Sequence, residues 1–312
     1  MNHPRGNVDC KRQRRFAEPP AGDWGQSPLP KPLATRRDND EFWRCMSDLR
    51  PIGVFDSGIG GLTVVKALRD LLPNENISYL GDTARVPYGP KSPETVQRYA
   101  IELAEMLMKQ NAKALVVACN TVSSVALPEL TKKFPVPVIG VIEPGASAAL
   151  ASSRNRHIGV IGTRATIRSG AYEKALRAAD ANVRVSSRAC PLLVPLIEEG
   201  LLNDEVTDRM ILRYLEPLLA DDIDTLVLGC THYPLLTGAI ARVLKRQIMI
   251  VDSAQNCARA VEDMLDRQSL RAAPLNHGEL HVALTDAADS FLNVARDALE
   301  LKFGEIEIRA LP

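Results

Sequence analysis

Two short segments of this chain are nearly the same, and their repetition limits the folds that the chain can adopt. LVVACNT at 115–121 and LVLGCTH at 226–232 each join an apolar, β-branched run to a cysteine and polar side chains. Such a run is typical of a buried strand. A second pair of similar segments begins at residues 52 and 158, with IGVFDSGIGGLTVVKAL and IGVIGTRATIRSGAYEKAL. The two similar offsets, 111 and 106 residues, predict two domains of related fold.

The segments between the repeats alternate between strand and helix patterns. Residues 52–56 and 77–82 are predicted strands, and 62–72 carries apolar residues at helical spacing. A further helix is predicted to begin with Ser92 as its N-cap and Pro93 at its first position. Two more strands are predicted, at 114–120 and 136–144. This alternation predicts an α/β protein with two open, mainly parallel sheets covered by helices. We expect the two domains to be related by a pseudo-two-fold axis, with the active site in the cleft between them.

Cys119 and Cys230 each follow a predicted strand, and ligands of open α/β sheets bind beyond the carboxyl ends of the strands. The two thiols are therefore predicted to face one another across a cleft. Two thiols on opposite faces of a planar carbanion could remove a proton from one face and return one to the other, which inverts a stereocentre. Three alternatives remain open: buried thiols that only pack, a zinc site that adds His232 and Asp56, and a redox disulfide.

Composition excludes several classes of protein. Lys plus Arg and Asp plus Glu both number 38, so no overall positive charge recruits nucleic acid as the main partner. No apolar run approaches the roughly 20 residues of a membrane helix, which predicts no membrane partner. The six cysteines lack CxxC spacing, and we expect them to be reduced thiols in a cytoplasmic protein.

Residues 1–50 differ from the rest of the chain. They contain basic clusters and scattered prolines with few core-forming residues, and they are predicted to form a disordered N-terminal extension. Met46 lies just before the first predicted strand and is a plausible start of the physiological chain. We expect deletion of residues 1–45 to leave turnover and thermal stability nearly unchanged.

Several motifs resemble one enzyme family. They are FDSGIGGLTV at 55–64, GDTARVPYG at 81–89, ACNT at 118–121 and LGCTHYPLL at 228–236. In this order they resemble the cofactor-independent amino-acid racemases, and among them the glutamate racemases of bacterial cell-wall synthesis, from residue 51 to about 300. The resemblance implies interconversion of L- and D-glutamate with no cofactor and no metal, which supplies D-glutamate for peptidoglycan.

The resemblance also implies catalytic roles for five residues. Cys119 would take the α-proton of the D-isomer, and Cys230 that of the L-isomer. Asp56 would assist Cys119, and His232 would assist Cys230 together with Glu198. The alternatives are an aspartate that shapes a turn and a histidine that is only structural.

Substrate binding is expected from hydroxyl, amide and loop N–H groups, which can bind carboxylates. The loop DSGIGG lacks the last glycine of a dinucleotide motif, so a carboxylate at the N-terminus of the following helix is the better predicted ligand. Beside Asp56 and His232, the resemblance implies these binding residues: Ser57, Tyr88, Gly89, Asn120, Thr121 and Thr231. Thr163 and Thr166, in the second copy of the repeat, are further candidates for binding a carboxylate.

The resemblance further implies a first domain made of residues 51–143 and 255–312, with residues 144–254 as the second. The chain would cross between them at Pro144-Gly145 and at Asp252-Ser253.

Two rival functions remain open: a racemase of aspartate or another amino acid, and a non-catalytic protein that binds a metal or ligand through the paired cysteines. A homodimer is compatible with the sequence, which does not set the oligomeric state.

Overall fold

The computed structural model describes residues 48–244, 248–287, 299–301 and 304–311. The expectations for Met46 and for the dispensability of residues 1–45 therefore lie outside the described residues. Asp48 to Arg50, which the sequence assigns to the disordered extension, pack on the folded chain instead. The backbone N–H of Asp48 donates to the carbonyl of Arg271 at 3.0 Å, and the Lys113 ammonium donates to the Asp48 carbonyl at 2.6 Å.

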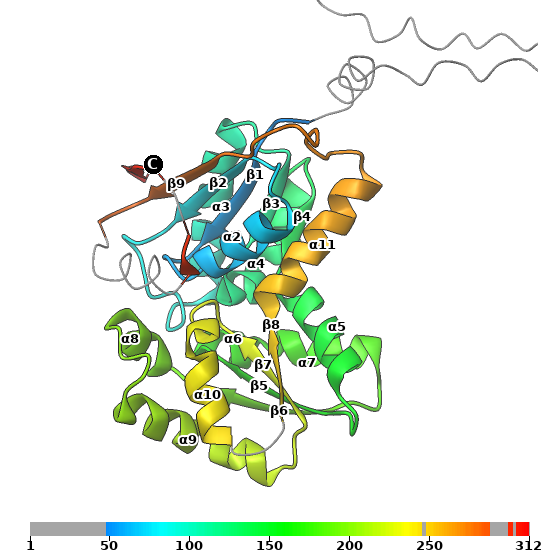
Figure 1. The fold of residues 1–312 in the computed structure, drawn as a ribbon, viewed down its shortest axis with the longest axis vertical. Helices are drawn as coiled ribbons and strands as arrows, with labels where there is room; N and C mark the ends of the chain where they lie inside the picture. The colour runs from blue at the N-terminus through cyan, green and yellow to red at the C-terminus, as the bar shows by residue number, and fades with distance from the viewer. Residues whose placement is uncertain (1–47, 245–247, 288–298, 302–303, 312) are drawn as a thin grey trace, which may run out of the picture. The chain divides into compact units, whose positions relative to one another are not determined.

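The first sheet holds six strands in the order β10-β9-β2-β1-β3-β4, and every adjacent pair is parallel (Figure 1). Four of its strands come from the first half of the chain, and two return from the C-terminal end. The strands are β1 (Ile52–Asp56), β2 (Ile77–Gly81), β3 (Ala114–Val117), β4 (Val138–Gly140), β9 (Leu280–Leu284) and β10 (Ile306–Ile308).

The second sheet has four parallel strands in the order β6-β5-β7-β8. This order repeats β2-β1-β3-β4 of the first sheet, so the two halves share one topology and the predicted two-domain α/β architecture is confirmed. The chain-crossing points stay predictions. The strands are β5 (His157–Gly162), β6 (Arg184–Ala189), β7 (Thr225–Gly229) and β8 (Met249–Asp252).

Helices cover both faces of each sheet, as expected for parallel strands that are apolar on both sides. Around the first sheet, α2 packs with α11, and α3 packs with α4 (Figure 1). Around the second, α5 packs with α7, and α9 packs with α10. The helices are α2 (Leu62–Leu71), α3 (Pro93–Lys109), α4 (Asn120–Lys133), α5 (Ile142–Ser152), α6 (Arg164–Ser169), α7 (Ala171–Ala179), α8 (Leu193–Glu198), α9 (Glu205–Ala220), the 3₁₀ turn η2 (Tyr233–Leu236), α10 (Thr237–Leu244) and α11 (Ser253–Arg267).

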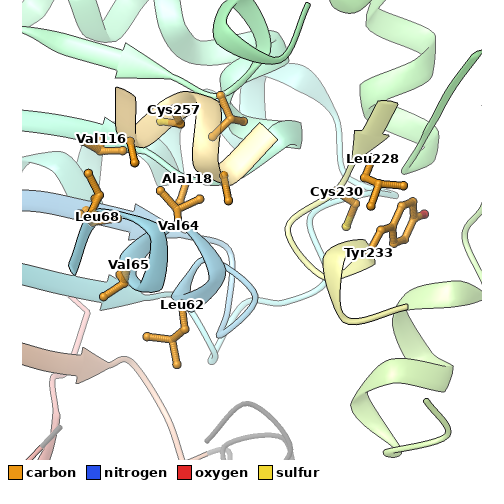
Figure 2. Close-up of a cluster of buried hydrophobic side chains, with 14 of the residues drawn as sticks. Leu62, Val64, Val65, Leu68, Val116, Ala118, Leu228, Cys230, Tyr233 and Cys257 are labelled. Atoms are coloured by element: carbon orange, nitrogen blue, oxygen red, sulfur yellow. The ribbon is translucent and has the colours of Figure 1, made fainter. Parts of the chain in front are cut away.

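Successive side chains of a strand point to opposite faces of its sheet, so the core is divided into separate clusters on the two faces. In β1, Ile52 and Val54 join the cluster that contains α2 and α11, whereas Phe55 joins the cluster of α3 and α4. Figure 2 shows two parts of the first cluster: side chains of α2 near Val116 and Ala118, and Leu228, Cys230 and Tyr233 around the end of β7. Cys119 belongs to the other cluster, so the two thiols rest on different parts of the core.

Local signals for helix α3 are confirmed. The Ser92 hydroxyl accepts a hydrogen bond from the backbone N–H of Thr95, and Pro93 occupies the first helical position. The strand predicted at 136–144 is wrong in its second half, because β4 ends at Gly140 and α5 begins at Ile142. Pro144 fits the first turn of α5 since no helical hydrogen bond needs its missing N–H. Among the described residues, no helix combines the length and apolar character of a membrane span.

Candidate active site

A cavity of about 220 Å³ lies where the predicted site residues meet. It is lined by residues that follow strands of both sheets, and it contains both Cys119 and Cys230. Of the predicted site residues, Asp56 and Thr166 are buried behind its wall, and all the others line it. The lining residues are Ser57, Val86, Pro87, Tyr88, Gly89, Pro90, Cys119, Asn120, Thr121, Thr163, Arg164, Pro191, Val194, Pro195, Glu198, Cys230, Thr231 and His232.

Cys119 lies at the N-cap of α4, two residues beyond the end of β3. Its side chain is almost entirely buried, and its Sγ lies 3.4 Å from Oγ of Ser57. Burial and the nearby Asp56 carboxylate raise the pKa of the Cys119 thiol to about 12, although the hydrogen bonds that it makes with the Ser57 hydroxyl and with the N–H of Val122 oppose the shift. In this environment the thiol keeps its proton at neutral pH.

Asp56 ends β1 and is fully buried. The backbone N–H groups of Gly58 and Gly61 both donate to its Oδ2 at 3.1 Å, and the Thr231 hydroxyl donates to its Oδ1 at 3.4 Å. Burial raises the pKa of this carboxyl group, while the charge of His232 and the loop N–H groups lower it. The loop was predicted to present its N–H groups to a substrate carboxylate, and this was wrong for Gly58 and Gly61, which bind Asp56.

Cys230 follows β7, in the position that corresponds to Cys119 in the first sheet. Its Sγ lies 3.8 Å from Nδ1 of His232, and Nε2 of His232 lies 3.2 Å from Oε1 of Glu198. Burial alone would lower the pKa of His232, but the hydrogen bonds to Cys230 and Glu198 and the charge of Asp56 raise it to about 10. An imidazolium at this position stabilises a thiolate on the neighbouring sulfur.

Three threonine hydroxyls join the two halves at the cavity wall. Thr121 follows β3, and its Oγ1 lies 2.9 Å from that of Thr163 and 3.3 Å from that of Thr166. Thr163 also caps α6, since its hydroxyl accepts from the backbone N–H of Thr166 at 3.2 Å. The arrangement fixes the positions of the Thr121 and Thr163 hydroxyls, which line the cavity, with Thr166 behind them.

Asn120 lines the cavity and carries a buried donor atom that the described residues leave unpaired. Its Oδ1 accepts a hydrogen bond from the Tyr172 hydroxyl at 2.7 Å, which orients the amide. Its Nδ2 is buried and has no hydrogen-bond partner in the described part of the chain. A buried donor without a partner is costly, so this amide is prepared to bind an acceptor atom of a ligand.

The loop that carries Tyr88 and Gly89 is held by a buried carboxylate. Asp82 accepts hydrogen bonds from Nε of Arg85 at 2.7 Å, from the Thr285 hydroxyl at 2.9 Å and from the Tyr88 hydroxyl. Burial, together with the Asp82 charge, raises the pKa of Tyr88 far above its usual range. A Cβ on Gly89 would lie 3.2 Å from Cβ of Thr163, so the loop also approaches the second half closely.

Sequence reasoning missed two features of the cavity. One is Arg164, an exposed cation at the start of α6 that lines the cavity beside Thr163. Arg164 lies in the repeated segment that begins at residue 158, directly after the candidate binding residue Thr163. Its position in the sequence could therefore have identified it. The other is a wall of prolines and valines, for which the sequence carries no signal: Val86, Pro87, Pro90, Pro191, Val194 and Pro195.

The described residues contain no group of three or more His, Cys, Asp or Glu side chains arranged to hold a metal ion. The pairs that do form, Cys230 with His232 and His232 with Glu198, are hydrogen-bonded pairs within the cavity wall. The side chains in and behind the cavity wall that can exchange protons are two thiols, an imidazole and carboxylates.

The family model for Asp/Glu/Hydantoin racemases matches residues 62–261. A glutamate racemase of Geobacter metallireducens is 48% identical over 257 residues, which span 82% of this chain and 95% of that protein. The crystal structure of a glutamate racemase isoform of Bacillus anthracis overlays with a TM-score of 0.80 at 42% identity, covering 84% of this chain and 98% of that chain. A Francisella tularensis glutamate racemase, crystallised with D-glutamate, overlays with a TM-score of 0.78 at 38% identity, covering 85% and 98%.

Proposed function

This chain belongs to the Asp/Glu/Hydantoin racemase family, and we propose that it interconverts L- and D-glutamate by moving the proton on Cα between two thiols. The observation that carries the proposal is the placement of Cys119 and Cys230 at corresponding strand ends of two sheets, lining one cavity. A duplicated fold with one thiol from each copy suits a reaction whose substrate and product are mirror images. The proposal takes residues 51–143 and 255–312 as one domain and residues 144–254 as the other.

In the L-to-D direction, the Cys230 thiolate removes the Cα proton and becomes a thiol. The electron pair of the broken C–H bond forms a planar carbanion, and Cys119 donates its own proton to the opposite face and becomes a thiolate. The D-to-L direction runs the same steps in reverse. Exchange of protons with water or reversal of the reaction restores the starting protonation states. The raised pKa of Cys119 and the imidazolium of His232 fit this assignment, because they provide an acid on one side and a stabilised base on the other.

Three neighbours would assist these transfers. Asp56 lies behind Cys119 and raises the basicity of its thiolate, which favours removal of the D-isomer's proton. His232 would stabilise the Cys230 thiolate, and Glu198 would orient the imidazole through its 3.2 Å contact. The thiol assignments and these assisting roles are our proposal.

The substrate carboxylates would be bound mainly by uncharged donors. Asn120 offers an unpaired Nδ2, and Ser57, Thr121 and Thr231 add hydroxyl groups to the same cavity. Tyr88, Gly89, Thr163 and Thr166 would hold the wall in shape. Because an α-proton is far less acidic than a thiol, hydrogen bonds to the α-carboxylate and the exclusion of water must stabilise the carbanion. The largely apolar wall of the cavity supports that exclusion.

We expect the reaction to need no cofactor and to supply D-glutamate for peptidoglycan in the cytoplasm. A homodimer, with which the sequence is compatible, stays a prediction.

Circular dichroism tests the proposal directly. The purified protein, dialysed against a chelator and supplied with no cofactor, should convert either enantiomer of glutamate to the racemate. Aspartate should react at least about a hundredfold more slowly, since a shorter side chain leaves the distal donors of the site without partners. Preferential racemisation of aspartate would reassign the substrate. Absence of racemisation with bound metal in the preparation would favour the non-catalytic alternative.

A further inference from the structure

A second cavity, of about 660 Å³, adjoins the proposed active site. Three arginines from three different elements line it: Arg164 at the start of α6, Arg188 near the end of the edge strand β6, and Arg213 on α9. The volume falls within the range of small-molecule sites. Arg164 and Pro191 line both this cavity and the active-site cavity, so the two are neighbours.

None of these three arginines forms an ion pair with a carboxylate in the described part of the chain. Two other arginines of the same half are paired: Arg209 on α9 contacts Glu205 at 2.6 Å, and Arg242 contacts Asp208 at 3.0 Å. A guanidinium does not relieve repulsion by losing its proton at physiological pH. The cavity therefore gathers three exposed positive charges that have no carboxylate partner among the described residues, in a chain whose formal net charge is zero.

Apolar and aromatic side chains complete the wall. Leu192 is about half exposed at the rim, and Met210 and Tyr214 lie beside it. The Tyr214 hydroxyl accepts a hydrogen bond from the backbone N–H of Leu192 at 3.4 Å, which ties the rim to α9. The cavity thus offers guanidinium forks for anionic oxygens and an apolar surface next to them.

We propose that Arg164, Arg188 and Arg213 form a binding site for a small polyanion that carries phosphate groups. A guanidinium binds phosphate oxygens through two parallel hydrogen bonds, and three of them suit a diphosphate better than a single carboxylate. This site is distinct from the active-site cavity that holds the two thiols, since Arg188 and Arg213 do not line that cavity. Its occupant would contact Arg164 at the mouth of that cavity.

Calorimetric titration with inorganic pyrophosphate, without glutamate, tests the proposal on the full-length protein. The unaltered protein should bind pyrophosphate, and Arg188→Gln and Arg213→Gln should each weaken binding by at least about tenfold. Arg209→Gln is the matched control, because it removes the same charge from the same helix outside the cavity, and it should change binding less than about twofold. A parallel titration with ADP distinguishes the sources of the phosphate group. If ADP binds more tightly than pyrophosphate, the natural ligand carries an organic group that contacts Leu192 and Met210. If the two bind equally, the site recognises the phosphate groups alone.

The proposal is overturned if the unaltered protein does not bind pyrophosphate, or if Arg209→Gln weakens binding as much as the cavity variants. It is also overturned if Arg188→Gln and Arg213→Gln raise the KM for glutamate several-fold while pyrophosphate binding is unchanged, since the arginines would then steer the substrate. Otherwise both variants should keep basal racemisation within about twofold. Because binding is measured without turnover, a failure here is separable from a failure of the proposed racemase activity.

Discussion

The surroundings of Cys119 and Cys230 differ although the two thiols occupy equivalent places in the two sheets. Cys119 has Ser57 and the buried Asp56 carboxylate beside it, and its pKa is raised to about 12. Cys230 has His232 beside it, whose pKa is raised to about 10. One sulfur is held as a protonated acid, and the other lies against an imidazolium that stabilises a thiolate. The repeated topology places the thiols, and the neighbouring residues make them chemically different.

In the proposed mechanism, the two sides therefore rely on different neighbours: Cys119 on the Asp56 carboxylate and Cys230 on the His232 imidazole. The two sides are also connected, because the Thr231 hydroxyl of the second half donates to Asp56 of the first.

Replacing either thiol should have the largest effect. Cys119→Ser and Cys230→Ser should each lower racemisation by about a thousandfold or more in both directions, because a hydroxyl is a far weaker acid than a thiol. Polarimetry with each enantiomer measures the loss. Cys257→Ser, which alters a buried thiol of α11 outside the cavity, is the control and should retain most of the activity. A variant of Cys119 or Cys230 with nearly full activity would contradict the two-thiol account.

Replacing the assisting residues should separate the two sides. Asp56→Asn and His232→Asn should each lower turnover by about a hundredfold. Enantiomers have equal free energies, so kcat/KM must fall equally in both directions, but kcat and the isotope effect of Cα-deuterated substrate can change unequally. Asp56→Asn should affect the D-to-L direction more, and His232→Asn the L-to-D direction. Identical isotope effects in both directions for both variants would remove this division of roles.

The loop after β1 offers a smaller test of the same comparison. A Cβ on Gly60 would lie 2.5 Å from Nδ1 of His232, whereas a Cβ on Gly58 would lie 3.6 Å from the Val86 side chain. Gly60→Ala must displace the imidazole and should lower turnover by about tenfold, because small misplacements of a catalytic group are costly. Gly58→Ala keeps the N–H that binds Asp56 and should lower turnover less than about threefold. Equal rates for the two variants would mean that the position of His232 is not critical.

The dependence of stability on pH should report the His232 environment. A histidine whose pKa is raised on folding from 6.5 to about 10 stabilises the folded state fully below pH 6.5, and this stabilisation declines as the pH rises toward 10. The difference in unfolding free energy between the unaltered protein and His232→Asn should therefore decrease from pH 6.5 to pH 10, by on the order of 1 to 3 kcal/mol. Denaturant unfolding at several pH values measures it. A difference that grows with pH would contradict the raised pKa.

Local sequence signals were sufficient for much of the fold and for the chemical centre of the site. The predicted strand at 52–56 matches β1 at both ends, because an apolar run followed by Asp-Ser-Gly marks where a strand stops. Cys119 and Cys230 were found for the same reason, since both stand directly after buried strands. The strand order of the second sheet repeats that of the first, so Cys119 and Cys230 follow corresponding strands. Both cysteines line the same cavity.

Features set by packing between distant elements could not be predicted in this way. Tyr172 orients Asn120 from a helix that lies 52 residues further along the chain. Arg164, Arg188 and Arg213 meet only because α9 packs against β6 and α6 starts beside it. The loop N–H groups at Gly58 and Gly61 bind Asp56, because Asp56 is buried where water cannot satisfy its oxygens.

Incorporation of solvent deuterium during the first turnovers tests the central claim most directly. If Cys119 and Cys230 act on opposite faces, the proton taken from the substrate stays on one sulfur while the product receives its proton from the other. Each thiol exchanges with solvent between turnovers. In deuterated water, the early product should therefore carry deuterium at Cα while the recovered substrate remains protiated, in both reaction directions. Deuterium that appears in the recovered substrate, or the original proton retained in the product, would show a single base acting on both faces and would contradict the two-thiol mechanism.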